Sequence, residues 1–194
     1  MNRTGMAALL AAATLTLAAC GAAAPAGAPP DPVATTESPV QTMKSADPVE
    51  SASPEGGAAV PEALRFSART LDGQAFEGAT LAGKPVVFWF WAPWCPKCRS
   101  DAPAVKAAAS AHRDVAFVGV AGLDAQPAMR EFVRSTGTGD LVHLSDQQGA
   151  VWTRLGVSQQ SVFVFVKPGG GTTKVTGPLG RDGLEAEIAK IRTG

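Results

Sequence analysis

The residues most informative about the fold of this chain are Val86-Val87-Phe88-Trp89-Phe90-Trp91-Ala92-Pro93-Trp94-Cys95-Pro96-Lys97-Cys98. The first six of these residues are all apolar, which predicts a strand buried on both faces of a sheet. A helix-compatible segment follows the second cysteine, over residues 99–111. Two cysteines separated by two residues at a strand-to-helix junction are typical of a redox-active dithiol.

The spacing of the two cysteines predicts a different role for each of them. If the helix begins near Cys95, that sulfur faces the unpaired N–H groups of the first turn, which favour a thiolate there. We therefore expect Cys95 to attack a foreign disulfide, and Cys98, one turn further in and more buried, to resolve the mixed disulfide. Pro96 suits the first turn, and Lys97 adds a cation nearby. Trp94 and Pro96 are expected to line a groove for the partner.

Three other interpretations of the cysteine pair compete with redox catalysis: a structural zinc site, a static disulfide, and two unconnected thiols. Structural zinc usually takes four ligands, and the other Cys and His residues of the chain, Cys20, His112 and His143, show no ligand spacing. A static disulfide across so short a loop would stabilise little. Redox catalysis is preferred, with no metal and no cofactor besides the Cys95–Cys98 disulfide, and the histidines are expected to be structural.

Residues 1–20 have the features of a bacterial export signal. Arg3 supplies positive charge, and the apolar stretch 6–19 is too short to span a membrane comfortably and ends in small residues. The sequence around Cys20 is similar to a lipobox, in which the cysteine becomes the lipidated first residue. The alternative is ordinary cleavage that leaves Cys20 unmodified. Both predict a location outside the cytoplasmic membrane, where disulfides persist, and we favour a lipid anchor on Cys20.

The composition divides the rest of the chain into two parts. Residues 21–61 are rich in Ala, Pro, Ser and Gly without a sustained apolar period, which predicts a disordered tether. Residues 62–194 have the size of one folded domain. The formal net charge of the chain is zero and it has no basic run, so nucleic acid is not an expected partner.

Strand-like and helix-like segments alternate along the folded part. This alternation predicts a mainly parallel sheet with helices on both faces, an α/β, thioredoxin-like fold that ends in a β-hairpin and a helix. Pro103 is expected to kink or restart the helix after the cysteines. The predicted strands are 65–69, 75–78, 85–91, 115–121, 141–144, 161–166 and 174–176, and the other predicted helices are 127–135, 146–155 and 184–191.

Several motifs resemble the TlpA, ResA and DsbE group of membrane-anchored, thioredoxin-like proteins, and above all the exported DsbE and DsbF proteins of actinobacteria. The resemblance implies the fold, an active Cys95–Cys98 pair, and exchange with exported proteins that carry thiols or disulfides. It rests on Gly83-Lys84-Pro85, the apolar strand, residues 91–98, Asp101-Ala102-Pro103, Val151-Trp152, Gly156-Val157 and residues 162–165.

The chain departs from this group at two positions. The group usually has Glu where this chain has Asp101, so a carboxylate there is expected to relay protons to and from the thiols. The alternatives are a solvated acid on the helix face, or a carboxylate that balances the charge of Arg99. The second departure is Ser161, which stands where the group usually has a cis-proline. A cis bond before a non-proline residue costs about 2.5–4 kcal/mol, so we expect a trans bond or a strained cis bond. Gln160 and Ser161 are expected to line the partner groove.

Three functions remain open at this point. The first is an oxidase that donates its disulfide to exported proteins, which Lys97 and the actinobacterial likeness favour. The second is a reductase for apocytochrome c or other exported thiols, recharged by a membrane redox partner. Both use the same exchange chemistry and differ in redox potential. The third is a lipid-anchored copper-binding module, because two soft thiolates suit Cu(I).

Overall fold

The computed structural model describes residues 59–193. The predicted export signal with Cys20, and nearly all of the predicted tether, lie outside this part of the chain. No helix within residues 59–193 is long and apolar enough to cross a membrane. The helices are η1 (Glu62–Leu64), η2 (Gly78–Leu81), α1 (Pro96–Ala111), α2 (Gln126–Thr136), α3 (Ala150–Arg154) and α4 (Gly180–Arg192), and the strands are β1 (Ser67–Arg69), β2 (Ala75–Glu77), β3 (Val86–Trp91), β4 (Ala116–Ala121), β5 (Val142–Ser145), β6 (Val162–Val166) and β7 (Thr172–Thr176).

A mixed five-stranded sheet forms the centre of the domain, with the strand order β5-β4-β3-β6-β7. Strands β3, β4 and β5 run parallel, whereas β6 is antiparallel to β3 and β7 is antiparallel to β6. The predicted α/β, thioredoxin-like fold is confirmed, including the hairpin of β6 and β7 and the last helix. Strands β1 and β2 form a separate antiparallel hairpin.

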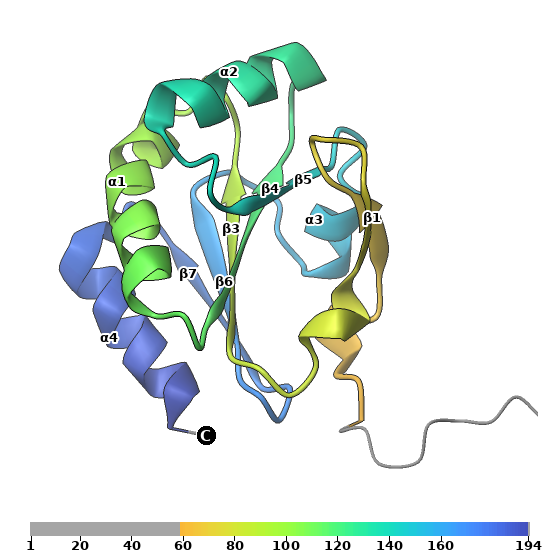
Figure 1. Ribbon diagram of the computed structural model, residues 1–194, viewed down its shortest axis with the longest axis vertical. Helices are drawn as coiled ribbons and strands as arrows, with labels where there is room; N and C mark the ends of the chain where they lie inside the picture. Colours follow the sequence, from red (N-terminus) through yellow and green to blue (C-terminus); the bar gives the residue numbers. More distant parts are fainter. Residues whose placement is uncertain (1–58, 194) are drawn as a thin grey trace, which may run out of the picture. The chain divides into compact units, whose positions relative to one another are not determined.

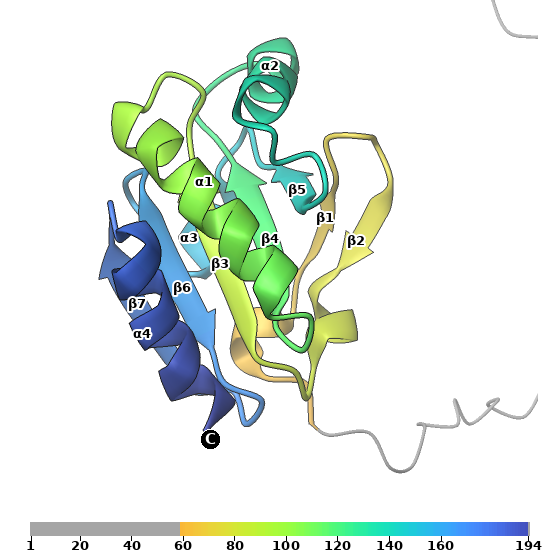
Figure 2. The same cartoon turned by 60° about the vertical axis from the view of Figure 1, so that its left-hand side comes forward.

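The central strand β3 is fully buried, as its apolar run predicts. Its side chains pack alternately into two hydrophobic cores, one on each face of the sheet, because successive side chains of a strand point to opposite faces. Helices α1 and α4 cover one face of the sheet, and α3 lies on the other (Figures 1 and 2). The first core contains Val87, Trp89 and Trp91 together with residues of α1, α2 and α4; the second contains Val86, Phe88 and Phe90 together with residues of α3 and η1.

Two details of the helices differ from the sequence predictions. Helix α1 runs without a break through Pro103, so of the two predicted outcomes, a kink or a restart, the restart is wrong and the kink stays a prediction. Pro103 is exposed, so water can reach the carbonyl that loses its helical donor at this position. The helix predicted over residues 146–155 begins only at Ala150, because Asp146 stays outside it and its Oδ2 accepts the backbone N–H of Trp152 over 2.9 Å.

Candidate functional site

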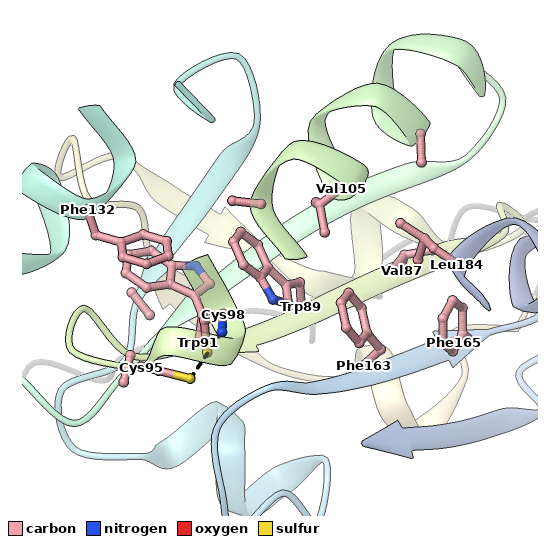
Figure 3. Packing of buried hydrophobic residues seen from close by; sticks show 14 of the residues in the cluster. Val87, Trp89, Trp91, Cys95, Cys98, Val105, Phe132, Phe163, Phe165 and Leu184 are labelled. Carbon is pink, nitrogen blue, oxygen red and sulfur yellow. Dashed lines mark hydrogen bonds between the residues drawn. The ribbon is translucent and has the colours of Figure 1, made fainter. Parts of the chain in front are cut away.

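The two cysteines lie where β3 ends and α1 begins. Cys95 is the N-cap of α1 and Pro96 occupies the first turn, as predicted. The backbone N–H of Cys98 donates a hydrogen bond of 3.1 Å to the Cys95 sulfur, drawn as a dashed line in Figure 3. The Cys95 sulfur therefore takes the place of the oxygen that usually caps a helix, and it satisfies one of the unpaired N–H groups of the first turn.

The two thiols differ in their surroundings. Both are free, and Cys95 is 3% exposed whereas Cys98 is 0% exposed. Burial raises the pKa of the Cys98 thiol from 9.0 to about 12, and the neighbouring Cys95 adds to the rise. Backbone groups of Ala92 and Ser161 act on Cys98 in the opposite direction and lower its pKa. Cys98 is thus a protonated thiol at neutral pH, as the expected resolving cysteine should be.

Asp101, one turn beyond Cys98 in α1, is 1% exposed and is not the solvated acid of the alternative interpretation. Its Oδ1 accepts the backbone N–H groups of Leu179 and Gly180 over 2.9 and 3.2 Å, and its Oδ2 accepts the hydroxyl of Ser161 over 3.1 Å. The carboxylate therefore joins α1 to the start of α4 and to the loop before β6. The proton relay predicted for Asp101 remains a prediction.

Ser161 lies in the loop that leads into β6 and is fully buried. Within residues 59–193 the cis peptide bond is the one between Gly177 and Pro178, so the Gln160–Ser161 bond is trans, the first of the two expected alternatives. The φ angle of Ser161 is +57°, in the left-handed region that non-glycine residues rarely occupy. The Ser161 N–H donates to the Phe90 carbonyl over 3.0 Å, which fixes the loop against the end of β3.

Gly177 packs against the buried side chains of Asp101 and Ser161, and it was not among the residues predicted from the sequence. Its N–H donates to the Ser161 carbonyl over 2.7 Å. A Cβ at this position would lie 2.6 Å from Ser161 Oγ and 2.7 Å from Asp101 Oδ2. Only glycine leaves room for these two oxygens to meet. The glycine before a proline carries no signal that distinguishes it from an ordinary turn, so the sequence alone could not reveal this role.

An exposed apolar surface flanks Cys95. Trp94 is 54% exposed and Leu123, in the loop after β4, is 50% exposed. The indole N–H of Trp94 donates to the Leu123 carbonyl over 3.3 Å, and Leu123 has a φ of +62°. Leu123 was not predicted to lie beside Cys95. The signal that could have placed it there is the expected parallel pairing of β3 and β4, which brings the segments after the two strands to the same edge of the sheet. A shallow cavity of about 240 Å³ beside Trp94 is lined by Pro93, Arg99, Asp124, Ala128, Glu131 and Phe132.

The remaining predicted residues fall into two groups. Pro96 and Lys97 are exposed beside the dithiol, and Gln160 is half-buried at the end of the Ser161 loop. The two histidines lie elsewhere and make structural contacts, as expected. His112 Nε2 is 2.7 Å from Glu185 Oε2 between α1 and α4, and buried His143 donates its Nε2–H to the Thr138 carbonyl over 3.0 Å.

A cavity of about 600 Å³ elsewhere in the domain is lined by neither cysteine. It lies between the β1–β2 hairpin and α3, and its lining includes Arg69, Glu77, Gln126 and Gln147. We place the functional site at the dithiol and not in this cavity, because reactive thiols are the only chemical requirement for exchange. Within residues 59–193 no three His, Cys, Asp or Glu side chains gather in a way that could hold a metal ion.

Comparison with known proteins identifies relatives of this chain. Residues 59–176 match the AhpC/TSA family. The soluble secreted antigen MPT53 of Mycobacterium tuberculosis and of Mycobacterium bovis is 40% identical over 136 residues, which cover 69% of this chain and 78% of the antigen.

Two solved structures are similar in fold as well as in sequence. MTB DsbF is 48% identical, with a TM-score of 0.66 over 68% of this chain and 98% of that protein. A secreted Mycobacterium tuberculosis disulfide oxidoreductase, described as homologous to DsbE of E. coli, is 40% identical with a TM-score of 0.62, over 66% of this chain and 98% of that protein.

Proposed function

Because this chain belongs to the thioredoxin-like AhpC/TSA family and is a thiol–disulfide oxidoreductase of the DsbE/DsbF type, we propose that it oxidises thiols of exported proteins through the Cys95–Cys98 pair. One observation carries the proposal: the Cys95 sulfur caps α1 and accepts the Cys98 N–H, while Cys98 is fully buried behind it. A sulfur at a helix N-terminus is stabilised as the attacking or leaving thiolate.

The exchange proceeds in two displacements at sulfur. In the oxidising direction, a partner thiolate attacks Cys95 of the Cys95–Cys98 disulfide, and Cys98 leaves with the electron pair and takes up a proton. A second partner thiolate then attacks the partner sulfur of the mixed disulfide and releases Cys95. The partner gains a disulfide, and the enzyme is left with the two free thiols of this structure. In the reducing direction the same steps run backwards, and Cys98 resolves the mixed disulfide.

The partner is proposed to bind across the exposed surface beside Cys95. Trp94 and Leu123 supply apolar area there, and Pro96 and Gln160 flank the dithiol. This surface suits extended or unfolded segments of exported proteins in which apolar residues neighbour a cysteine. Ser161 is buried, so we assign the Ser161 loop to the groove through its backbone and not through its hydroxyl.

We also propose that the protein works outside the cytoplasmic membrane and is anchored there by lipid on Cys20. The support is the lipobox-like sequence around Cys20 together with the secreted nature of MPT53 and of the M. tuberculosis oxidoreductase. Mass spectrometry of the protein purified from membranes tests the anchor, since a diacylated N-terminal cysteine adds a mass that unmodified Cys20 lacks.

The direction of electron flow is tested by the equilibrium of the dithiol. Full-length protein carrying Cys20→Ser has thiols only at Cys95 and Cys98. It is incubated in graded glutathione buffers, quenched in acid, and the free thiols are counted by mass-tagged alkylation. A potential near or above about −180 mV supports the oxidase, and a potential near or below about −270 mV favours a reductase recharged from the membrane. Cys98→Ser, which cannot close the pair, is the control.

A further inference from the structure

A polar cavity opens at the same edge of the sheet as the dithiol. Trp91, Ala121 and Ser145 are paired side by side at the carboxyl ends of the parallel strands β3, β4 and β5 (Figure 2). Cys95 lies four residues beyond the first of them, and the third lines the cavity of about 600 Å³. Because neighbouring strands lie about 4.8 Å apart, the cavity begins about 10 Å across the sheet from the strand that leads to Cys95.

Hydrogen bonds connect the surface beside Cys95 to this cavity. The indole N–H of Trp94 donates to the Leu123 carbonyl, and the carbonyl of the next residue, Asp124, accepts the side-chain N–H of Gln147 over 3.4 Å. Gln147 is exposed and lines the cavity. The loop after β4 thus joins the apolar surface at Trp94 and Leu123 to the cavity, so one extended polypeptide can cross both.

Asp146 places a buried carboxylate in the wall of this cavity. The residue is 6% exposed, and its Oδ2 accepts the backbone N–H of Trp152. Its Oδ1 has no hydrogen-bond partner within residues 59–193, and it is not one of the fully enclosed atoms of that part of the chain that lack a partner. Oδ1 is therefore the part of Asp146 that water reaches at the cavity wall. A buried carboxylate is stabilised by a charge partner, and an incoming cation can supply one there.

The cavity carries more negative than positive charge. Glu77 lines it from the β1–β2 hairpin, and its Oε2 accepts the Ser67 hydroxyl over 2.6 Å. Arg69 is the cation of the lining, and its guanidinium donates to the Gly73 carbonyl over 3.1 Å. The ion pairs formed within residues 59–193 include neither Glu77, Asp146 nor Arg69. Two unpaired carboxylates therefore face the cavity, which favours a cation as its occupant.

We propose that this cavity binds a lysine or arginine side chain of the polypeptide that exchanges disulfides at Cys95, with Asp146 and Glu77 as its ion-pair partners. The inference rests on the proposed exchange function and adds a requirement on the sequence of the partner. An extended chain advances about 3.3–3.6 Å per residue, so the separation of about 10 Å and the loop beyond β3 correspond to about three to five residues. The cation should stand at that spacing from the partner cysteine.

The probes are blocked glycine–serine peptides whose single cysteine carries thionitrobenzoate as a mixed disulfide. In the reduced full-length Cys20→Ser protein, the Cys95 thiolate attacks the peptide sulfur, and thionitrobenzoate leaves with the electron pair of the broken bond. Cys98 then attacks Cys95, and the peptide thiol takes up the proton that Cys98 loses. The absorbance of released thionitrobenzoate gives the rate at which the mixed disulfide of Cys95 and the peptide forms, and this intermediate is common to both directions of exchange.

The peptide set separates a spaced cation from positive charge in general. Two peptides carry a lysine about four residues before or after the cysteine, and their counterparts carry glutamine at the same place. A further peptide has the lysine next to the cysteine and so keeps the net charge. Each rate is divided by the rate of the same peptide with dithiothreitol. We expect one spaced-lysine peptide to react about five- to tenfold faster than its glutamine counterpart and the adjacent-lysine peptide at low salt, and less than about twofold faster in about 0.5 M salt.

Two variants test the carboxylates separately. Asp146→Asn and Glu77→Gln each remove one charge and keep an oxygen for the hydrogen bonds from Trp152 and Ser67. Either change should reduce the advantage of the spaced lysine to about twofold or less. Asp182→Asn, which removes the charge of an exposed acid in the first turn of α4, is the matched control and should keep the advantage. Glu77 is exposed on the hairpin, so Glu77→Gln carries the test if Asp146→Asn does not fold.

Three results would overturn the inference. One is equal rates for the spaced-lysine and glutamine peptides. Another is an equal advantage for the adjacent lysine, which indicates general attraction of positive charge, and the third is an advantage that survives both carboxylate variants. A failure of the proposed function looks different, because no peptide would then react faster with the wild-type dithiol than with Cys95→Ser. The outcomes for the cavity and for the dithiol chemistry are therefore distinguishable in one experiment.

Discussion

Cys98 donates its backbone N–H to the Cys95 sulfur over 3.1 Å, so the resolving cysteine helps to stabilise the sulfur that it later attacks. Cys95 does not stabilise a thiolate at Cys98 in return. Burial and the neighbouring Cys95 both raise the pKa of Cys98, to about 12. The pair is therefore asymmetric before any partner arrives, with a capped sulfur in front and a protonated thiol behind.

This asymmetry predicts the alkylation behaviour of Cys95→Ser, made together with Cys20→Ser so that Cys98 is the one cysteine left in the chain. A pKa of about 12 against the ordinary 9.0 leaves Cys98 with about a thousandth of the usual thiolate fraction at neutral pH. In Cys95→Ser the contribution of Cys95 is lost, but burial, the largest cause, remains. The rate of iodoacetamide modification of Cys95→Ser should therefore keep rising well beyond pH 9, as followed by mass spectrometry. A plateau below pH 9 would refute this, and denatured protein provides the reference rate.

The same pKa predicts that the reduced domain weakens in alkali. Cys98 binds its proton more tightly in the folded protein than in the unfolded chain, so its contribution to stability is complete below pH 9 and is lost as the pH rises from 9 toward 12. Between pH 8 and pH 10 the reduced wild type should lose about 1 kcal/mol more unfolding free energy than reduced Cys98→Ser. Urea unfolding of both proteins measures the difference, and parallel pH profiles would contradict the expectation.

The sequence predicted the elements that depend on local pattern. The apolar run 86–91 gave the central strand, and the position of Cys95 at the start of α1 followed from the spacing of the pair. The restart at Pro103 was wrong because the exposure of α1 at this residue, which lets water reach the carbonyl left without a helical donor, is a property of the folded domain. The bond between Asp101 and Ser161 joins positions 60 residues apart, and no periodicity in the sequence reports such a contact.

Trp94 is expected to serve protein partners and not the chemistry at sulfur. It is 54% exposed and is fixed by its hydrogen bond to the Leu123 carbonyl. Trp94→Ala should lower kcat/KM for an unfolded, reduced protein substrate about tenfold, the loss of one apolar anchor, while the reaction with a small disulfide reagent changes less than about twofold. Val142→Ala, which trims another exposed apolar residue on the edge strand β5, is the control. Equal losses with both substrates would show that Trp94 acts on the thiols instead.

Gly119 in β4 is expected to be intolerant of any side chain. A Cβ there would lie 2.1 Å from Nδ1 of the buried His143 and 2.9 Å from the Trp91 indole nitrogen. Gly119→Ala should lower the unfolding free energy by about 2–3 kcal/mol, because neither ring has room to move. Gly139→Ala, whose new Cβ would meet its nearest neighbour at 3.9 Å, should change the free energy by less than about 0.5 kcal/mol. Urea unfolding at pH 7.5 compares the two, and similar losses would contradict the packing argument.

His143 is expected to make the domain sensitive to acid. Burial lowers its pKa below 6.5, although the Thr138 carbonyl and Asp72 oppose the shift. As the pH falls, the unfolded chain therefore binds a proton at His143 before the folded chain does. The contribution of neutral His143 to the unfolding free energy is fully present above pH 6.5 and decreases below it, by at most about 1.4 kcal/mol per pH unit. His143→Gln keeps an N–H donor for the Thr138 carbonyl and does not titrate, so its unfolding free energy should depend less on pH between 7 and 5. His112→Gln removes the more exposed histidine paired with Glu185 and serves as the matched control. If the two variants have the same pH profile, the acid sensitivity does not originate at His143.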